Sequence, residues 1–208
     1  REVRDFVEDT LPETARRRSV VVAATSDRPA LTRARAAMAM MAVAEHFRDE
    51  GRNVLLLSDS ITRFVEAQAE VAAAAGEAFS PNGFPASMAQ TAMSLAERAG
   101  PGAAGQGDIT AIFSVLVAGS DMEGPVADVM RGVLDGHVVL SREIAERGRY
   151  PAIDVLASVS RALPNAATKD ELALIARARQ LLGAYDRAEL MLQSGLYSPG
   201  SDSTTDAA

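Results

Sequence analysis

One aspartate follows a predicted strand, at the edge of the sheet where α/β proteins bind their ligands. Residues 53–59 read NVLLLSD, so a continuous apolar run ends in Asp59. Open α/β sheets bind their ligands at the carboxyl ends of the strands, and a carboxylate placed there is able to bind a metal ion. The alternative is that Asp59 merely caps the helix that follows. The apolar run by itself leaves both interpretations open.

Other side chains that could do chemistry have less support from their surroundings. Ser60 and Ser160 have no histidine partner at a recognisable spacing, so a nucleophilic triad is unsupported. His46 lies on a charged helix end and His137 precedes a predicted strand, so neither is expected to be a metal ligand or a base. The three arginines at 16–18 are expected to form a solvated edge rather than a nucleic-acid patch.

The elements that must position Asp59 are predicted from four apolar runs. These runs are continuous rather than alternating, which is typical of strands buried on both faces of a parallel sheet. They lie at residues 19–25, 53–59, 109–119 and 137–141. Between them the pattern predicts a widely buried helix over 30–50, ended by Gly51, and a second helix that begins after Ser60 as N-cap. Alternating strands and helices predict an α/β sheet with right-handed crossovers.

The pattern changes near the end of the chain. From Thr168 a single long helix is expected, because Leu174, Ala178, Leu181 and Tyr185 share one face. We therefore expect one domain over 1–165 and the start of a separate helical domain over 166–208. The tail from Ser198 is rich in Ser, Gly, Asp and Thr and is expected to fray.

Composition narrows the classes of protein. The chain has 208 residues, of which 48% are hydrophobic, so it can bury a real core. The net charge of −7 argues against a nucleic-acid binder, which needs a basic face, and there is no cysteine for a disulfide or thiolate metal site. The apolar run at 109–119 is too short to span a bilayer, which takes about 20 residues. Since the chain opens on Arg1 and other charged residues, we expect it to be a piece of a longer protein.

Four segments carry a resemblance to a known family. They read ATSD at 24–27, DSITRF at 59–64, LDGHVVLSR at 134–142 and YPAIDVLASVSR at 150–161. In this order they resemble the motifs of the bacterial type III secretion and flagellum-specific ATPases, which share a ring-forming RecA-like fold with the catalytic head of rotary ATP synthases. The resemblance implies the second half of an α/β RecA-like P-loop NTPase core, with a mostly parallel sheet flanked by helices, followed by the start of an α-helical C-terminal domain.

The same resemblance implies roles for five residues and names ATP and Mg²⁺ as cofactors. Asp59 matches the Walker B carboxylate that holds Mg²⁺, and Glu2 matches a residue near the water shell of that ion. Arg161 matches the arginine finger, which reaches into the nucleotide site of the next subunit and suits the spreading charge of a γ-phosphate. Tyr150 matches the aromatic residue that stacks on adenine, and Tyr197 a second wall. The alternatives are a salt bridge for Arg161 and packing against the following proline for Tyr150.

The chain also departs from the family pattern. It contains no G-x-x-x-x-G-K-[ST] sequence, and the general-base glutamate of the family falls before Arg1. We therefore expect no ATP hydrolysis by these 208 residues alone. Residues 85–89 read PASMA where the family has PPSVF, and 120–125 read SDMEGP where it has DDMNEP. Both segments belong to loops expected near a central stalk.

From this resemblance we expect a homo-hexameric Mg-ATP-hydrolysing motor for protein export. Its partners would be the flagellar or injectisome export apparatus (stalk, stator-like regulator and export gate), the export substrates and their chaperones. Nucleic acid is not expected, and membrane association would be peripheral at most. The protein would be cytoplasmic, at the inner-membrane face of the apparatus, and the flagellar branch is favoured. The alternative is a non-catalytic nucleotide-binding or assembly subunit of the same fold.

Overall fold

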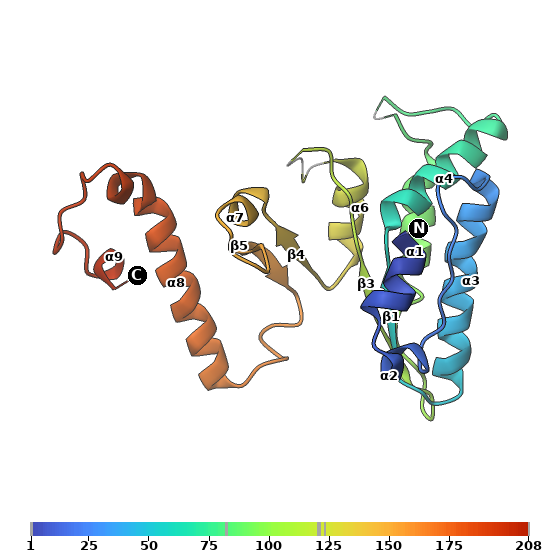
Figure 1. Cartoon of the computed structure of the whole chain (residues 1–208), viewed down its shortest axis with the longest axis horizontal. Coiled ribbons are helices and arrows are strands. Elements are labelled where there is room, and N and C mark those ends of the chain that lie inside the picture. The colour runs from blue at the N-terminus through green and yellow to red at the C-terminus, as the bar shows by residue number, and fades with distance from the viewer. Residues whose placement is uncertain (1, 82, 120–121, 123, 208) are drawn as a thin grey trace. The chain divides into compact units, whose positions relative to one another are not determined.

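The structure, a computed structural model, describes residues 2–81, 83–119, 122 and 124–207, with the side chain of Glu2 excepted. The chain divides into two units, Arg1–Val133 and Leu134–Ala208 (Figure 1). Each unit has its own strands and helices and is described by itself. The expected domain boundary at 165/166 stays a prediction. None of the helices in the described part of the chain is long and apolar enough to cross a membrane.

The first unit is built on a small sheet. Strand β1 (Val54–Ser58) pairs in parallel with β3 (Asp108–Phe113), from Val54 opposite Ile109 to Ser58 opposite Phe113. The two-residue strand β2 (Gly100–Pro101) adds to β3 in the antiparallel sense. Because β1 and β3 are parallel and in register, their carboxyl ends meet at one edge of the sheet. The residues that follow the two strands are thereby brought together.

Helices cover one face of this sheet. Helix α3 (Ala30–Asp49) packs on β1 and β3 and on α4 (Ile61–Ala74) (Figure 1). Helix α4 contacts α5 (Ser87–Ala96), and α5 contacts α6 (Pro125–Val133). The short helices α1 (Glu2–Asp5), η1 (Phe6–Thr10) and α2 (Glu13–Arg16) precede them. The largest fully buried side chains lie on these helices: Met41, Ile61, Leu95, Met130 and Val65. Helix α3 begins and ends as predicted, with Gly51 at φ +82° just beyond it.

Two expectations for the first unit are wrong. Residues 19–25 form no strand: Val20, Val21 and Val22 are exposed and have no partner strand among the described residues. The strands are also not buried on both faces, because Leu55, Leu57 and Ile112 are each more than half exposed. An apolar run becomes a strand buried on both faces only where it has a neighbouring strand and a covering layer on each face. Among the described residues, 19–25 lack the neighbouring strand, whereas β1 and β3 lack a layer over the face that carries Leu55, Leu57 and Ile112.

The second unit contains an antiparallel pair and a long helix. Strand β4 (Gly136–Leu140) pairs with β5 (Ile153–Ser160), and α7 (Arg142–Glu146) lies between them in the chain. Helix α8 (Lys169–Gln193) contacts β5 and begins with a capping box between Thr168 and Glu171, where the sequence predicts a long helix. The tail that was expected to fray contains a short helix, α9 (Ser203–Asp206), whose N-cap is Asp202.

Strand β5 is the main element that the apolar pattern missed. Its sequence, IDVLASVS, mixes polar and small residues with apolar ones and so lacks the continuous run that marked the other strands. Its pairing with β4 is antiparallel, whereas the sequence pattern favours parallel strands. The hairpin forms because β4 and β5 are neighbours in the chain, joined by a connection that carries only one short helix.

Candidate functional site

Asp59 follows β1 directly and is exposed at the carboxyl edge of the sheet. The Ser114 hydroxyl donates a hydrogen bond to Asp59 Oδ1 at 2.8 Å. Ser114 is itself fixed, because its backbone N–H donates to the Ser58 carbonyl at 3.0 Å. The residue after β3 therefore orients the carboxylate after β1. Sequence reasoning missed Ser114, since its position opposite Asp59 depends on the strand register.

The turn after Asp59 is tied to the same segment. Ser60, not Asp59, is the N-cap of α4: its buried hydroxyl accepts a hydrogen bond from the Arg63 backbone N–H at 3.3 Å. The Thr62 hydroxyl accepts from the Leu116 N–H at 2.8 Å, and the Ile61 N–H donates to the Ser114 carbonyl at 3.0 Å. The helix-cap explanation for Asp59 is therefore wrong. Its carboxylate is left to face solvent at the edge of the sheet.

The residues present fit a magnesium–nucleotide complex with a single protein carboxylate. Among the described residues, no group of three or more Asp, Glu, His or Cys side chains could hold a metal ion. Mg²⁺ in nucleotide sites is bound by one or two carboxylates, with water and substrate phosphates completing the shell. Asp59, exposed and oriented by one hydroxyl, matches that pattern. The other predicted metal residue, Glu2, has its side chain outside the described residues.

Arg161 follows β5 directly, and its backbone is fixed by the strand that precedes it. Its N–H donates to the Asp135 carbonyl at 2.7 Å, which closes the β4–β5 pair at this end. Gly136 makes the close approach feasible, because a Cβ on it would meet the Val159 carbonyl oxygen at 2.5 Å. The Arg161 side chain itself is exposed. Because Gly136 of the LDGH segment has no side chain, the start of β4 packs closely against the residues that precede Arg161.

The two tyrosines occupy different places in the second unit. Tyr150 lies three residues before β5, at the opposite end of the strand from Arg161, and its side chain is 74% exposed. The paired part of the hairpin is about 13 Å long, because the five residues of β4, which lies beside β5, rise by roughly 3.3 Å per residue. Tyr150 and Arg161 therefore lie beyond opposite ends of the hairpin. The structure does not bring them together.

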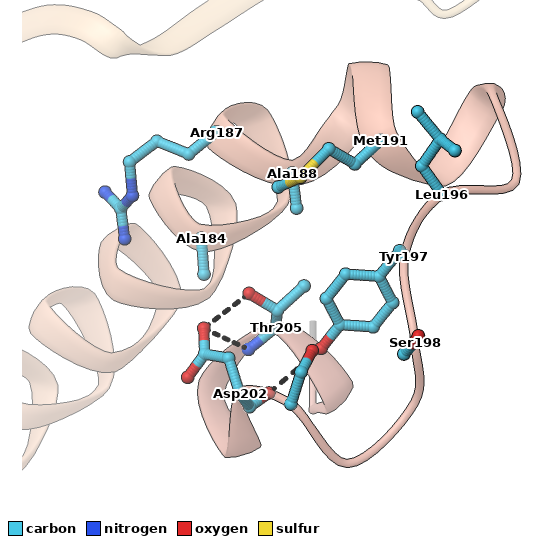
Figure 2. Close-up of a pocket in the computed structure, with 10 residues that line it drawn as sticks. Ala184, Arg187, Ala188, Met191, Leu196, Tyr197, Ser198, Asp202 and Thr205 are labelled. Atoms are coloured by element: carbon cyan, nitrogen blue, oxygen red, sulfur yellow. Dashed lines mark hydrogen bonds between the residues drawn. The ribbon is translucent and has the colours of Figure 1, made fainter.

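Tyr197 lies in an open hollow of about 380 Å³ between α8 and α9 (Figure 2). Its hydroxyl is 2.9 Å from Asp206 Oδ1 and 3.2 Å from the Asp202 carbonyl oxygen, and Ala184 and Ala188 of α8 line the same hollow. The Thr205 hydroxyl and the Thr204 N–H hold the pKa of Asp202 below its usual range. The Tyr197 hydroxyl is thus already engaged within the tail that follows α8, and the assignment of Tyr197 as a second adenine wall stays a prediction.

The predicted site residues fall into two sets. Asp59 belongs to the first unit, whereas Arg161, Tyr150 and Tyr197 belong to the second. Each set is ordered by its own secondary structure: the carboxylate by a parallel strand pair, and the arginine by an antiparallel hairpin. This organisation, with an oriented carboxylate at a sheet edge and an exposed arginine at a strand end, invites comparison with nucleotide-binding folds.

Residues 1–160 match the family model described as the ATP synthase alpha/beta family, nucleotide-binding domain. The chain belongs to the ATP synthase alpha/beta family. Residues 167–208 match a second family model, the T3SS EscN ATPase C-terminal domain. Both the expected family and the α/β RecA-like fold class are thereby confirmed.

Curated relatives come from both export branches. The chain is 50% identical over 208 residues to a type 3 secretion system ATPase of Pseudomonas savastanoi pv. phaseolicola, covering all of this chain and 46% of that protein. It is 47% identical over 213 residues to a flagellum-specific ATP synthase of Caulobacter vibrioides, covering all of this chain and 48% of that protein. The chain spans about half the length of the curated relatives it matches. With both branches so close in identity, the flagellar assignment stays a prediction.

Solved structures give the same family. The assembled ATPase EscN from the enteropathogenic E. coli type III secretion system aligns with a TM-score of 0.93 at 42% identity, over 99% of this chain and 49% of that one. EscN in complex with its central stalk EscO aligns with a TM-score of 0.90 at 42% identity, over 100% of this chain and 49% of that one.

Proposed function

We propose that this chain is part of an ATPase that energises bacterial protein export by hydrolysing Mg-ATP at the interfaces between identical subunits. The observation that carries the proposal is the 50% identity, over all 208 residues, to a type 3 secretion system ATPase. The geometry supports it, because an oriented carboxylate (Asp59), an exposed arginine (Arg161) and an exposed tyrosine (Tyr150) lie at the ends of strands, where a ligand can reach them.

In this proposal Asp59 is the carboxylate that holds Mg²⁺, and Ser114 keeps that carboxylate in one orientation through the 2.8 Å hydrogen bond. When bound, Mg²⁺ neutralises charge that develops on the phosphate oxygens. Glu2 is proposed to contact the water shell of the ion. Tyr150, which is mostly exposed, offers its ring face for adenine stacking, and Tyr197 is proposed as a second wall.

Arg161 is proposed to act on the nucleotide of the neighbouring subunit. A guanidinium is always charged and presents a planar fork of N–H donors, which suits several phosphate oxygens at once. Arginine fingers of this kind contribute roughly 10³–10⁵-fold in rate. Because Tyr150 and Arg161 lie beyond opposite ends of the β4–β5 hairpin, the two residues suit two different nucleotides: Tyr150 its own subunit's and Arg161 the neighbour's.

The proposed assembly is a homo-hexamer, with the export apparatus, its central stalk, stator-like regulator and export gate, and the export substrates with their chaperones as partners. EscN has been solved as an assembled ATPase in complex with its central stalk EscO, which supports an assembly of subunits with a stalk as partner. We propose a cytoplasmic location at the inner-membrane face of that apparatus, and the flagellar branch as the system served.

The test is complementation between two inactive variants of the full-length protein. Arg161→Ala should lower kcat by about 10³-fold or more, as loss of an arginine finger does, while ATP binding and folding persist. Asp59→Ala should be inactive for a different reason, because it loses the metal carboxylate.

Mixed rings of the two variants should regain activity, since some interfaces then join an intact Asp59 to an intact Arg161. A structural salt bridge of Arg161, or a non-catalytic subunit, predicts no recovery. If subunit exchange is confirmed by mass spectrometry and the mixture stays inactive, the shared-site mechanism is wrong for this protein.

A further inference from the structure

Strand β5 contains a large bulge just before Arg161. Gly136 and His137 of β4 pair with Ser160 and Val159, but the next pair along β4 is Val139 with Asp154. Four residues of β5, 155–158, therefore face a single residue of β4. A bulge leaves backbone groups without ladder partners, and those groups must be satisfied in another way.

Two side chains within the hairpin satisfy part of the bulge. Asp154 Oδ1 accepts a hydrogen bond from the Ala157 N–H at 2.9 Å. The Ser158 hydroxyl donates to the Asp154 carbonyl at 2.5 Å and accepts from the Val139 N–H at 3.0 Å. These bonds account for N–H groups around the bulge. The carbonyl groups of the bulge need donors from elsewhere.

Those donors come from Arg179 on α8. Its Nη1 donates to the Val155 carbonyl at 2.6 Å and reaches the Ser158 carbonyl at 3.4 Å, while Nη2 donates to the Leu156 carbonyl at 2.8 Å. Hydrogen bonds from a charged donor are stronger than those between neutral groups, and a rigid guanidinium fork fixes the relative positions of its acceptors. Arg179 therefore holds the bulge in one conformation.

The bulge controls how the chain enters Arg161. Ser158, the last carbonyl that Arg179 reaches, lies three residues before Arg161, and only the pairs at Val159 and Ser160 intervene. The helix that carries Arg179 is itself anchored to the hairpin connection, because Glu189 accepts a hydrogen bond from Arg147 at 2.5 Å. A shift of α8 would thus move the bulge and, with it, the backbone at Arg161.

We propose that Arg179 is a positioning residue for Arg161, which it aligns by clamping the β5 bulge from α8. The proposal rests on the proposed function, in which Arg161 acts on a neighbouring nucleotide. It deepens that function, because it makes α8 of the C-terminal segment a part of the device that sets the finger. Arg179 contacts no nucleotide in this scheme and acts only through β5.

The chain offers a matched control on the same helix. Arg177 is also exposed, and its hydrogen bond to Gln180 Oε1 at 3.1 Å stays within α8. Arg177→Ala removes the same type of charged side chain from α8 as Arg179→Ala does, but it removes no hydrogen bond to β5. Any effect that the two variants share reflects α8 itself rather than the clamp.

The first readout is activity of the full-length protein. Arg179→Ala should lower kcat by about 10- to 100-fold, the range expected when a catalytic group is misplaced by around 1 Å, while KM for ATP stays within about twofold. Arg177→Ala should retain kcat. Arg179→Lys should fall between wild type and Arg179→Ala, because an ammonium keeps the charge but loses the fork. Wild-type kcat in Arg179→Ala would overturn the proposal.

Complementation then shows on which side of the interface Arg179 acts. Arg179→Ala mixed with Asp59→Ala should exceed the summed activity of the two separate variants, whereas Arg179→Ala mixed with Arg161→Ala should not. Two results would overturn the proposal. The first is recovery of activity when Arg179→Ala is mixed with Arg161→Ala. The second is no recovery when Arg179→Ala is mixed with Asp59→Ala, although Arg161→Ala does recover when it is mixed with Asp59→Ala. Failure of the Arg161→Ala and Asp59→Ala pair itself would instead refute the proposed function and this inference together.

Hydrogen exchange tests the clamp without any reliance on catalysis. The N–H groups of Ala157 and Arg161 should exchange at least about tenfold faster in Arg179→Ala than in Arg177→Ala, because release of the bulge exposes their hydrogen bonds. Equal rates in the two variants would overturn the clamp even if kcat falls. If Arg179→Ala does not form rings, Arg179→Lys replaces it in each measurement, with the same outcomes deciding.

Discussion

Replacing Gly136 by alanine tests the packing that fixes Arg161. A Cβ at this position would lie 2.5 Å from the Val159 carbonyl oxygen and 3.1 Å from Ser160 Cα, whereas ordinary contact begins at 3.4 Å. Both close atoms belong to the backbone, so no side chain can rotate away. The β4–β5 pair must open by about 0.9 Å, the difference between 3.4 and 2.5 Å.

The energetic consequence follows from that displacement. Overpacking of this kind costs about 1–3 kcal/mol. The same opening would stretch the 2.7 Å hydrogen bond from the Arg161 N–H to the Asp135 carbonyl toward 3.6 Å, at which it is no longer a hydrogen bond. Its loss adds about 0.5–1.5 kcal/mol. We expect Gly136→Ala to lower the free energy of unfolding by about 1.5–4.5 kcal/mol and to lower kcat.

The assay is urea unfolding of the full-length protein, followed by circular dichroism and set beside kcat. Gly183→Ala is the matched control, because Gly183 lies inside α8 and its added Cβ would meet only the Arg187 side chain at 3.5 Å. That variant should be more stable than wild type by roughly 0.5–1 kcal/mol, since alanine favours the helix. The reasoning is refuted if Gly136→Ala is as stable as Gly183→Ala.

Two further predictions concern the first unit. Ser114→Ala removes the hydroxyl that orients Asp59, so the Mg²⁺ concentration for half-maximal ATPase activity should rise severalfold, as expected for the loss of one hydrogen bond of about 1 kcal/mol. Ser114→Thr, which keeps a hydroxyl, should retain the wild-type Mg²⁺ dependence. An unchanged Mg²⁺ titration in Ser114→Ala would show that Ser114 has no such role. Glu45 accepts hydrogen bonds from Arg98 at 2.7 and 2.6 Å, which hold the pKa of Glu45 below its usual value. The stabilisation that ionised Glu45 contributes is therefore present above about pH 4.5 and is lost as pH falls through the lowered pKa of the folded state. The free energy of unfolding, measured from pH 6 to 3, should fall less steeply in Glu45→Gln than in wild type. Parallel curves for the two proteins would contradict this.

What could be predicted from the sequence depends on short-range physical rules. Ser60 as a helix N-cap and the capping-box start of α8 at Thr168 need only residues within one helical turn. The end of α3 before Gly51 needs only a residue that adopts positive φ easily. Asp59 at a strand end follows from one apolar run. Each of these features is encoded within a few residues, so the sequence alone determined it.

The partners of the site residues depend on contacts between distant parts of the chain. Ser114 meets Asp59 across 55 residues because β1 and β3 pair in one register, and Arg179 meets Val155 across 24 residues because α8 packs on β5. Gly136 is required only because β4 closes on β5. Register, bulges and helix packing depend on the fit of whole elements to each other, which local residue patterns do not encode. The sequence by itself therefore identified Asp59 and Arg161 as candidate site residues, whereas only the tertiary structure showed which residues hold them in place.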